Sequence, residues 1–255
     1  MKGTIPAIFL VVFFLCACNK KKFFDGPDNY QDGFENYSTL ADLLLPDDLY
    51  WSYTQQTRPG NTIEVDSSQH HTGTHSLKFV AKKSDNEGAS KSSIAKQHMA
   101  FWEGETVRMR AWYFIEGVNS LDWLFLMDLE EQTAIGAGPG MRLALVDNQL
   151  RMEYKFNEKD ITQPTVQAID FPRNQWVEIL WELKLSRKNK GSVKLWQNGQ
   201  LLIDRQNVRT LPKDILYFQQ GTKGMYSSCE IGITADSKEN DLTLWVDDIQ
   251  FEKVN

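Results

Sequence analysis

The chain has 255 residues, with 28 Lys and Arg against 34 Asp and Glu, which gives a formal net charge of −6 at pH 7. A chain this acidic is a poor candidate for nucleic-acid binding, and a polyanionic ligand would need a local basic surface. Hydrophobic residues make up 41% of the sequence. A chain of this length and composition can bury a substantial core within one domain.

The N-terminus predicts an export signal. Lys2 supplies its positive charge, and the apolar run at 5–17 is shorter than the ~20 residues that a membrane-spanning helix needs. The sequence LCAC at 15–18 resembles the lipobox of bacterial lipoproteins, where a small residue precedes a cysteine that receives lipid. This resemblance implies cleavage after residue 17, lipid on Cys18 and an extracytoplasmic protein anchored to the bacterial membrane. Asn19 resembles an outer-membrane sorting residue. The alternative is an ordinary signal peptide with a chance cysteine.

The export prediction also accounts for the cysteines. Cys16 would leave with the signal and Cys18 would carry lipid, so Cys229 stands alone and no internal disulfide is expected. Residues 19–31 contain a lysine cluster and a Gly-Pro pair without apolar periodicity, which predicts a solvated tether. Contact of these lysines with anionic headgroups is the alternative, and it would add little to a lipid anchor. The expected organisation is a signal peptide at 1–17, the lipidated cysteine and tether at 18–31, and one domain at 32–255.

The domain predicts β-structure almost throughout. Segments rich in β-branched and aromatic residues lie at 107–115, 123–130, 141–146, 150–156, 176–185, 192–196, 201–204, 229–235 and 242–251. Asn198-Gly199 between two of these segments is a strong hairpin signal, because both central residues of the favoured tight turn need positive φ. Short helical turns are expected at 38–45, before Pro46, and at 213–218.

Alternation in two of these strands separates an apolar face from a mixed one. Segments 107–115 and 176–185 each place apolar side chains on one side and charged groups with tryptophan on the other. The mixed face contains Arg108, Arg110, Trp112, Trp176, Glu178 and Lys184. Tryptophan can stack on a sugar ring and the polar groups can hydrogen-bond to it, so this face is a candidate for substrate binding. The alternative is the polar exterior of an amphipathic sandwich.

The order of several short motifs resembles a concanavalin A-like jelly roll. The motifs are Phe34-Glu35, His71-Thr72-Gly73, SLKF at 76–79, Trp176 opening a strand toward Glu182, the hairpin at 193–199 and VDDI at 246–249. The combination is similar to bacterial polysaccharide lyases of the heparin lyase I and alginate lyase type, and to related glycan-binding modules, over about residues 32–254. This resemblance implies an all-β sandwich of two curved antiparallel sheets, with polysaccharide lying across the concave sheet.

The catalytic motifs of the resembled lyases are not matched. Such lyases carry Gln-x-His on a central strand and Tyr-Phe-Lys-x-Gly-x-Tyr on a late strand, and the His and Tyr act as base and acid in β-elimination at a uronic acid. The corresponding segments here are 128–130 and 228–234, in which the His becomes acidic, Glu230 replaces the Lys and Thr234 replaces the last Tyr. A uronate would meet carboxylates instead of a neutralising cation, which opposes elimination.

Asp128 and Glu130 suggest a second chemistry. Positions i and i+2 of a strand share a face, so both carboxyl groups would point into one groove, as in glycoside hydrolases. The segment is also similar to the Glu-x-Asp-x-Glu strand of jelly-roll β-glucanases, but Leu126 stands where the nucleophile belongs. The alternative is that the pair faces solvent or hydrogen-bonds to sugar hydroxyls. His98 is a further candidate for a general base, with a surface histidine as its alternative.

The resemblance also implies a structural calcium ion. Many modules of this shape bind calcium with a Glu near the first strand, an Asp of the closing strand and carbonyl groups of an intervening turn. Glu35, Asp247 or Asp248, and the turn at 71–73 occupy these places, and such oxygen ligands suit calcium. The alternative is that the two aspartates only end the last strand.

Two functional classes follow from these observations. The preferred prediction is an envelope lipoprotein that binds polysaccharide on a jelly-roll face, because binding tolerates the loss of catalytic groups. The alternative is a polysaccharide-cleaving enzyme, a lyase or less readily a glycoside hydrolase, with a displaced active site that includes Asp128, Glu130 or His98. A structural accessory protein of the envelope is a third class.

Overall fold

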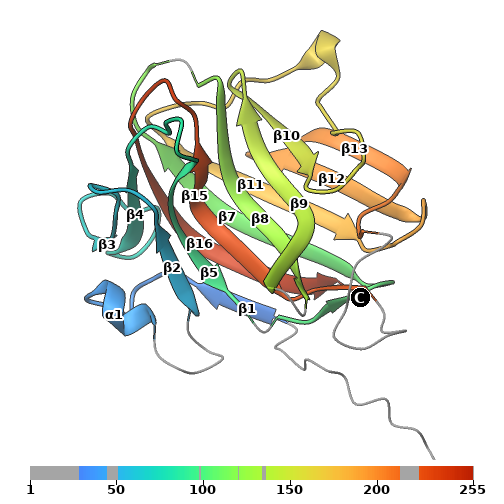
Figure 1. Cartoon of the computed structure of the whole chain (residues 1–255), viewed down its shortest axis with the longest axis horizontal. Helices are drawn as coiled ribbons and strands as arrows, with labels where there is room; N and C mark the ends of the chain where they lie inside the picture. Colours follow the sequence, from blue (N-terminus) through green and yellow to red (C-terminus); the bar gives the residue numbers. More distant parts are fainter. Residues whose placement is uncertain are drawn as a thin grey trace, which may run out of the picture.

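The computed structural model describes residues 29–44, 51–97, 99–119, 121–133, 136–212 and 224–254. These residues form two antiparallel sheets that stack face to face, with strongly curved strands at the front of the view (Figure 1). The predicted all-β jelly-roll sandwich is therefore confirmed. Among the described residues, no helix has the length and apolar character needed to cross a membrane.

Each sheet is described by the order of its strands. Sheet A has the order β13 (Gln200–Val208), β12 (Gly191–Gln197), β11 (Trp176–Lys184), β7 (Thr106–Ile115), β16 (Leu242–Val254), β4 (Ser76–Ala81) and β3 (Thr62–Asp66), and β1 (Asn29–Asp32) also pairs with β16. Sheet B has the order β10 (Gln149–Tyr154), β9 (Gly136–Val146), β8 (Trp123–Thr133), β15 (Ser228–Asp236), β5 (Ser90–Lys96) and β2 (Tyr53–Gln56). Smaller elements are β6 (Phe101–Trp102), β14 (Met225–Tyr226), the helix α1 (Leu40–Leu43) and the 3₁₀ turn η1 (Thr165–Gln167).

The turns follow the sequence signals closely. Asn198 and Gly199 have φ of 48° and 75° and join β12 to β13, which confirms the predicted hairpin. Asp147 and Asn148, with φ of 50° and 62°, join β9 to β10 in the same way. The helix α1 lies within the segment expected to be helical at 38–45. The second expected helical turn, at 213–218, lies outside the described residues.

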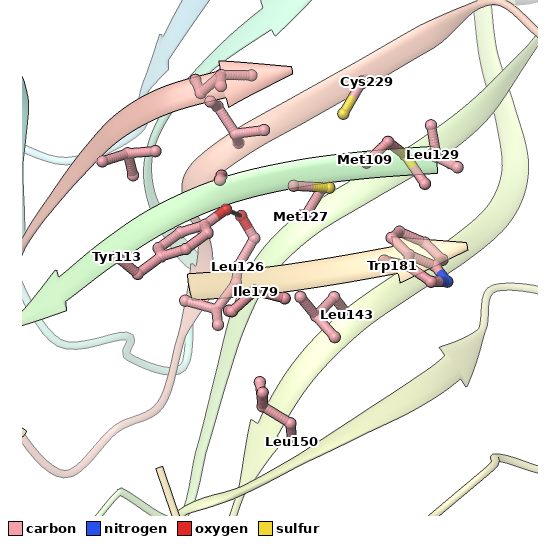
Figure 2. Close-up of a cluster of buried hydrophobic side chains, with 14 of the residues drawn as sticks. Met109, Tyr113, Leu126, Met127, Leu129, Leu143, Leu150, Ile179, Trp181 and Cys229 are labelled. Atoms are coloured by element: carbon pink, nitrogen blue, oxygen red, sulfur yellow. Dashed lines mark hydrogen bonds between the residues drawn. The ribbon is translucent and has the colours of Figure 1, made fainter. Parts of the chain in front are cut away.

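The core lies between the two sheets. Figure 2 shows Met109 and Trp181 of sheet A facing Leu126 and Cys229 of sheet B, and all four side chains are buried. The hydroxyl of Tyr113, also buried here, donates a hydrogen bond of 3.2 Å to the carbonyl of Leu126 (Figure 2). Each large apolar side chain removed from water contributes ~1.5–3 kcal/mol to folding. The alternation predicted for β7 and β11 is confirmed, because their apolar faces fill this core.

Asp32 at the end of β1 attaches the start of the domain to the core. Its Oδ2 accepts hydrogen bonds from the hydroxyls of Tyr30 and Tyr37, both at 3.0 Å, and from Nε1 of Trp51 at 2.9 Å. Its Oδ1 accepts a bond of 2.8 Å from the amide of Phe34. Trp51 and Phe34 are fully buried. One carboxylate therefore links the first strand, the segment that follows it and the approach to β2.

We expect Asp32→Ala to lower the free energy of unfolding by ~2–4 kcal/mol, because it leaves several buried donors without an acceptor. Urea unfolding of the mature chain measures this change. Asp204→Ala on the edge strand β13 is the control, since an exposed carboxylate should alter stability by less than ~0.5 kcal/mol. Equal stability of the two variants would contradict the role given to Asp32.

Candidate functional site

The six residues predicted to contact sugar lie together on the outer face of sheet A. Arg108, Arg110 and Trp112 come from β7, and Trp176, Glu178 and Lys184 come from β11. The strand register sets Trp112 opposite Glu178. The side chains with the opposite parity point into the core.

Neighbouring side chains already occupy much of this face. The ring of His71 stacks on Trp112 with centroids 3.7 Å apart and an interplanar angle of 14°. His71 also meets Trp176 edge-on at 5.9 Å. Arg108 donates hydrogen bonds to Glu182 at 2.7 Å and to Glu252 at 3.2 Å. One ring face of Trp112 is therefore covered, and the charged groups are neutralised by one another.

Arg110 follows the same pattern on the outer face of sheet A. Its Nε lies 3.2 Å from Oε1 of Glu178, so these two predicted sugar contacts form an ion pair with each other. Lys184 at the end of β11 is exposed. A ligand on this face would have to compete with existing pairs at most of the predicted positions.

Asp128 and Glu130 lie on the outer face of sheet B, on the opposite side of the sandwich. Asp128 is opposite Glu230 of β15, and Glu130 is opposite Ser228. Leu129 between them points into the core, so the prediction that the two carboxyl groups share a face is confirmed. The two sets of predicted residues belong to different outer faces and cannot form one site.

Two cations on the neighbouring strands neutralise this carboxylate pair. Nε of Arg142 on β9 donates a hydrogen bond of 2.6 Å to Oδ1 of Asp128, while its guanidinium lies 3.8 Å from the ring centroid of Phe125. Nζ of Lys155, just after β10, forms an ion pair with Glu130 and lies 3.8 Å from Oδ1 of Asp128. Arg142 and Lys155 are not among the residues predicted from the sequence to form a site. Both residues lie in predicted strands, at 141–146 and 150–156, and this was the feature of the sequence that could have pointed to them.

Glu230 is the third carboxyl group of this face and is only 2% exposed. The hydroxyl of Ser93 on β5 donates a hydrogen bond to its Oε1. Burial raises the pKa of Glu230 to about 7, and the charges of Asp128 and Glu130 add to the increase, while Lys91 and Ser93 oppose it. Glu230 therefore exchanges its proton near neutral pH.

Tyr53 on β2 lies near the same three carboxyl groups. Burial raises the pKa of Tyr53 to about 12, and the charges of Glu230, Glu130 and Asp128 add to this effect. The phenol therefore keeps its proton at neutral pH and can donate a hydrogen bond. We call the outer-face residues Tyr53, Ser93, Asp128, Glu130, Arg142, Lys155, Ser228 and Glu230 the sheet B cluster.

The sheet B cluster retains unused hydrogen-bonding capacity. Oδ2 of Asp128 and Oγ of Ser228 are both buried, and neither has a hydrogen-bond partner among the residues that the structure describes. A buried polar atom without a partner costs ~1–3 kcal/mol of stability. Such atoms are unusual in folded proteins and are often explained by a role in a functional site. Nε of Arg110 and Nε1 of Trp176 on the outer face of sheet A are in the same state, so these atoms do not by themselves decide between the two faces.

Two of the predicted functional residues, Cys18 and His98, lie outside the described residues. Lipidation of Cys18 and a general-base role for His98 therefore stay predictions.

The residues predicted to hold calcium come together at another place, around the turn at 71–75. Glu35 accepts hydrogen bonds of 2.9 Å from the amides of Thr74 and His75. Oδ2 of Asp247 accepts the amide of His71 at 2.8 Å, and Oδ2 of Asp248 lies 2.6 Å from Nδ1 of the same histidine.

Gly73 allows this close approach. A Cβ atom at this position would lie 2.2 Å from Oε1 of Glu35, and its φ of +60° also favours glycine. The turn presents N–H groups to the carboxylates, whereas calcium would need the carbonyl oxygens. Within the described ranges, no group of three or more His, Cys, Asp or Glu side chains could hold a metal ion. In this arrangement N–H groups occupy the carboxylates of Glu35 and Asp247, and the calcium ion stays a prediction.

A calcium ion that recruits the carbonyl groups of the turn should raise the thermal unfolding midpoint. The expected gain in the free energy of unfolding is ~2.7 kcal/mol when the calcium concentration is about 100 times the dissociation constant. Scanning calorimetry in calcium and in excess chelator measures it. Asp247→Asn should abolish the increase, whereas Asp204→Asn on β13 should keep it. Identical midpoints with calcium and with chelator would contradict the calcium prediction.

The fold and the sheet B cluster define a β-sandwich with an ionisable outer face. The chain belongs to the polysaccharide lyase family, whose model matches residues 48–250. No curated protein sequence matches the chain. Membership of this family connects the protein to polysaccharide, as a ligand that it binds or a substrate that it cleaves.

Solved structures with the same fold include several lyases. The chain is similar to an endo-β-1,4-glucuronan lyase from the fungus Trichoderma reesei, with 15% identity, a TM-score of 0.64, and coverage of 80% of this chain and 91% of that one. It is also similar to the alginate lyase Aly36B, with 11% identity, a TM-score of 0.61, and coverage of 91% and 99%. The cellulose-induced protein Cip1 shares 17% identity at a TM-score of 0.59, with coverage of 87% and 95%. At these identities the likeness shows the fold.

Proposed function

We propose that the outer face of sheet B binds an acidic polysaccharide. The observation that carries this proposal is the layering of charge on the face. The side chains of Arg142 and Lys155 are 18% and 22% exposed, whereas those of Asp128 and Glu130 beneath them are 1% and 10% exposed. A ligand that approaches this face meets cations first.

Arg151 on β10 extends this cationic layer. Its side chain is 29% exposed and forms an ion pair with Glu153, which is 15% exposed. The register places Glu153 of β10 opposite Arg142 of β9. Arg151 lies two residues before Glu153 on the same face of β10, so the two arginines lie on neighbouring strands of one face. The unpartnered Oδ2 of Asp128 and Oγ of Ser228 supply an acceptor and a hydroxyl for sugar groups. Two of the similar structures are a glucuronan lyase and an alginate lyase, which supports an acidic polymer as the ligand.

We expect Arg142→Gln to weaken binding of alginate or polyglucuronate by about tenfold or more, because a charge-assisted hydrogen bond contributes ~1.5–3 kcal/mol. Isothermal titration calorimetry of the mature chain measures the affinity. Arg108→Gln is the matched control, since Arg108 also forms ion pairs with two partners but on sheet A.

Trp176→Ala should likewise leave the affinity unchanged, since Trp176 lies on sheet A. Loss of binding in the sheet A variants with normal binding in Arg142→Gln would contradict the choice of face.

Cleavage by β-elimination is the second candidate, and the position of Tyr53 favours it. In this reaction a base removes the proton next to the uronate carboxylate, a carbon–carbon double bond forms, and the glycosidic oxygen leaves with a proton. Tyr53 keeps its proton at neutral pH and would donate it to the leaving oxygen. Lys155 would neutralise the uronate carboxylate, which lowers the barrier to proton removal.

Absorbance of unsaturated uronates, recorded during incubation with alginate and polyglucuronate, tests cleavage. We expect Tyr53→Phe to abolish turnover by the mature chain while binding persists, because the ring remains and the proton donor is lost. Turnover that survives in Tyr53→Phe would exclude this assignment. Binding of both polymers by the wild type without any turnover would leave recognition as the function.

We also propose that the protein is a lipoprotein of the bacterial envelope. Support comes from the sequence LCAC at 15–18 and from the short apolar run before it. The tether expected at 18–31 overlaps β1 (Asn29–Asp32), the first described strand, which pairs with β16. The proposed tether between lipid and domain is therefore shortened to residues 19–28.

We expect Cys18→Ser to move the protein from the membrane fraction to the soluble fraction, because the lysines of the tether alone attach weakly. Cell fractionation checks the location, and mass spectrometry of the N-terminal peptide checks the lipid. Cys16→Ser is the matched control and should leave the protein on the membrane. An unmodified Cys18 in membrane-extracted protein would rule out the anchor.

A further inference from the structure

We infer that Glu230 makes binding at the sheet B cluster depend on pH, by admitting a polyuronate when its side chain is uncharged and repelling it when charged. This inference rests on the proposed function, since it concerns the same face and an acidic ligand. It goes beyond that function because it assigns control of affinity to one carboxyl group.

Two of the three carboxyl groups on this face have cationic partners. Asp128 has Arg142 at 2.6 Å and Lys155 at 3.8 Å, and Glu130 has Lys155 as its ion-pair partner. Glu230 receives only the hydroxyl of Ser93. Within the part of the chain that the structure describes, no cation lies within ion-pair distance of Glu230. Ionised Glu230 is therefore the carboxylate whose charge stays uncompensated by direct contact.

The groups that face Glu230 come from three neighbouring strands. Strand β8 presents Asp128 directly opposite and Glu130 beyond it, β5 contributes the more distant charge of Lys91, and β2 contributes the phenol of Tyr53. Arg142 and Lys155 reach the cluster from β9 and the end of β10, but they contact the β8 carboxylates.

Glu230 is buried at a lower free-energy cost when it is protonated, because a buried charge without an ion-pair partner is strongly unfavourable. Its pKa of about 7, raised chiefly by burial, places the change near neutral pH. Below about pH 7 Glu230 is neutral, and the two cations offset the two remaining carboxylates. Above that pH the face gains one negative charge, and a uronate bound over it is repelled.

Glu230 is buried and acts through its charge, without touching the ligand. A unit charge about 8 Å away, at an effective dielectric constant of ~20–40, changes a dissociation constant by a factor of roughly five to thirty. Uronate carboxyl groups have a pKa near that of other carboxylic acids and stay ionised across this range. Glu230 with a pKa of about 7 is about one-tenth ionised at pH 6 and nine-tenths ionised at pH 8, so the dissociation constant should rise by roughly three- to eightfold between these values.

The test is calorimetric titration of the full mature chain with polyglucuronate and with alginate at about pH 6, 7 and 8 and fixed ionic strength. Glu230→Gln keeps the shape of the neutral acid, so its affinity should stay at the low-pH value throughout. Asp236→Asn is the matched control. Asp236 is buried at the other end of β15, and burial raises its pKa to about 8, but it does not belong to the sheet B cluster. This control should keep the wild-type pH profile.

Ser93→Ala provides a second variant should Glu230→Gln fold poorly. The Ser93 hydroxyl lowers the pKa of Glu230, so its removal should move the midpoint of the affinity change to higher pH. A wild-type affinity that is constant from pH 6 to 8 would overturn the inference, as would an unchanged profile in Glu230→Gln. Failure of the wild type to bind either polymer at every pH would overturn the proposed function itself, and this inference with it.

Discussion

The pairing of β8 with β15 is the constraint on which the sheet B cluster depends. It sets Asp128 opposite Glu230 and Glu130 opposite Ser228, which gathers three carboxyl groups at the centre of one sheet. Burial of a carboxylate is unfavourable unless it is paired, hydrogen-bonded or protonated. All three solutions occur here. Arg142 pairs with Asp128 and Lys155 pairs with Glu130, Ser93 donates a hydrogen bond to Glu230, and the pKa of Glu230 is raised to about 7.

The two outer faces of the sandwich handle charge differently. On sheet A the strand register sets Glu252, Arg108, Glu182 and Lys194 beside one another, so that opposite charges alternate across four strands. Cross-strand pairs of this kind stabilise a sheet and leave little unsatisfied charge for a ligand. On sheet B the acids lie deeper, since the side chains of Asp128 and Glu130 are 1% and 10% exposed, against 15% and 21% for Glu182 and Glu178 on sheet A. The depth of the acids, and not the number of aromatic residues, separates the two faces.

Local sequence patterns predicted local structure well. Alternation in β7 and β11 identified their buried faces, and Asn198-Gly199 identified a hairpin, because both features depend on near neighbours. Whether Trp112 and Asp128 share a face depends on which sheet each strand joins, and local patterns do not determine this. The sheet B cluster also needs β8 to pair with β15, although the two strands are about 100 residues apart in the sequence. Arg142 and Lys155 could not be selected because only the register across β8, β9 and β10 brings them to Asp128 and Glu130.

The departure from the resembled lyase motif also has a physical consequence. Where the motif implies a lysine on the late strand, this chain has Glu230, and the cations of the cluster come from β9 and the end of β10. The attraction for an anionic ligand is therefore displaced from β15 toward the β10 edge of sheet B. On the proposed function, a polyuronate would place its carboxylates above Arg142 and Lys155. Its sugar hydroxyls would then lie toward Asp128 and Ser228, where Oδ2 and Oγ lack partners. Ionised Glu230 would repel the carboxylates of a polyuronate bound in this way. The reason is that Asp128 and Ser228, toward which the sugar hydroxyls would lie, belong to β8 and to β15, the strand of Glu230.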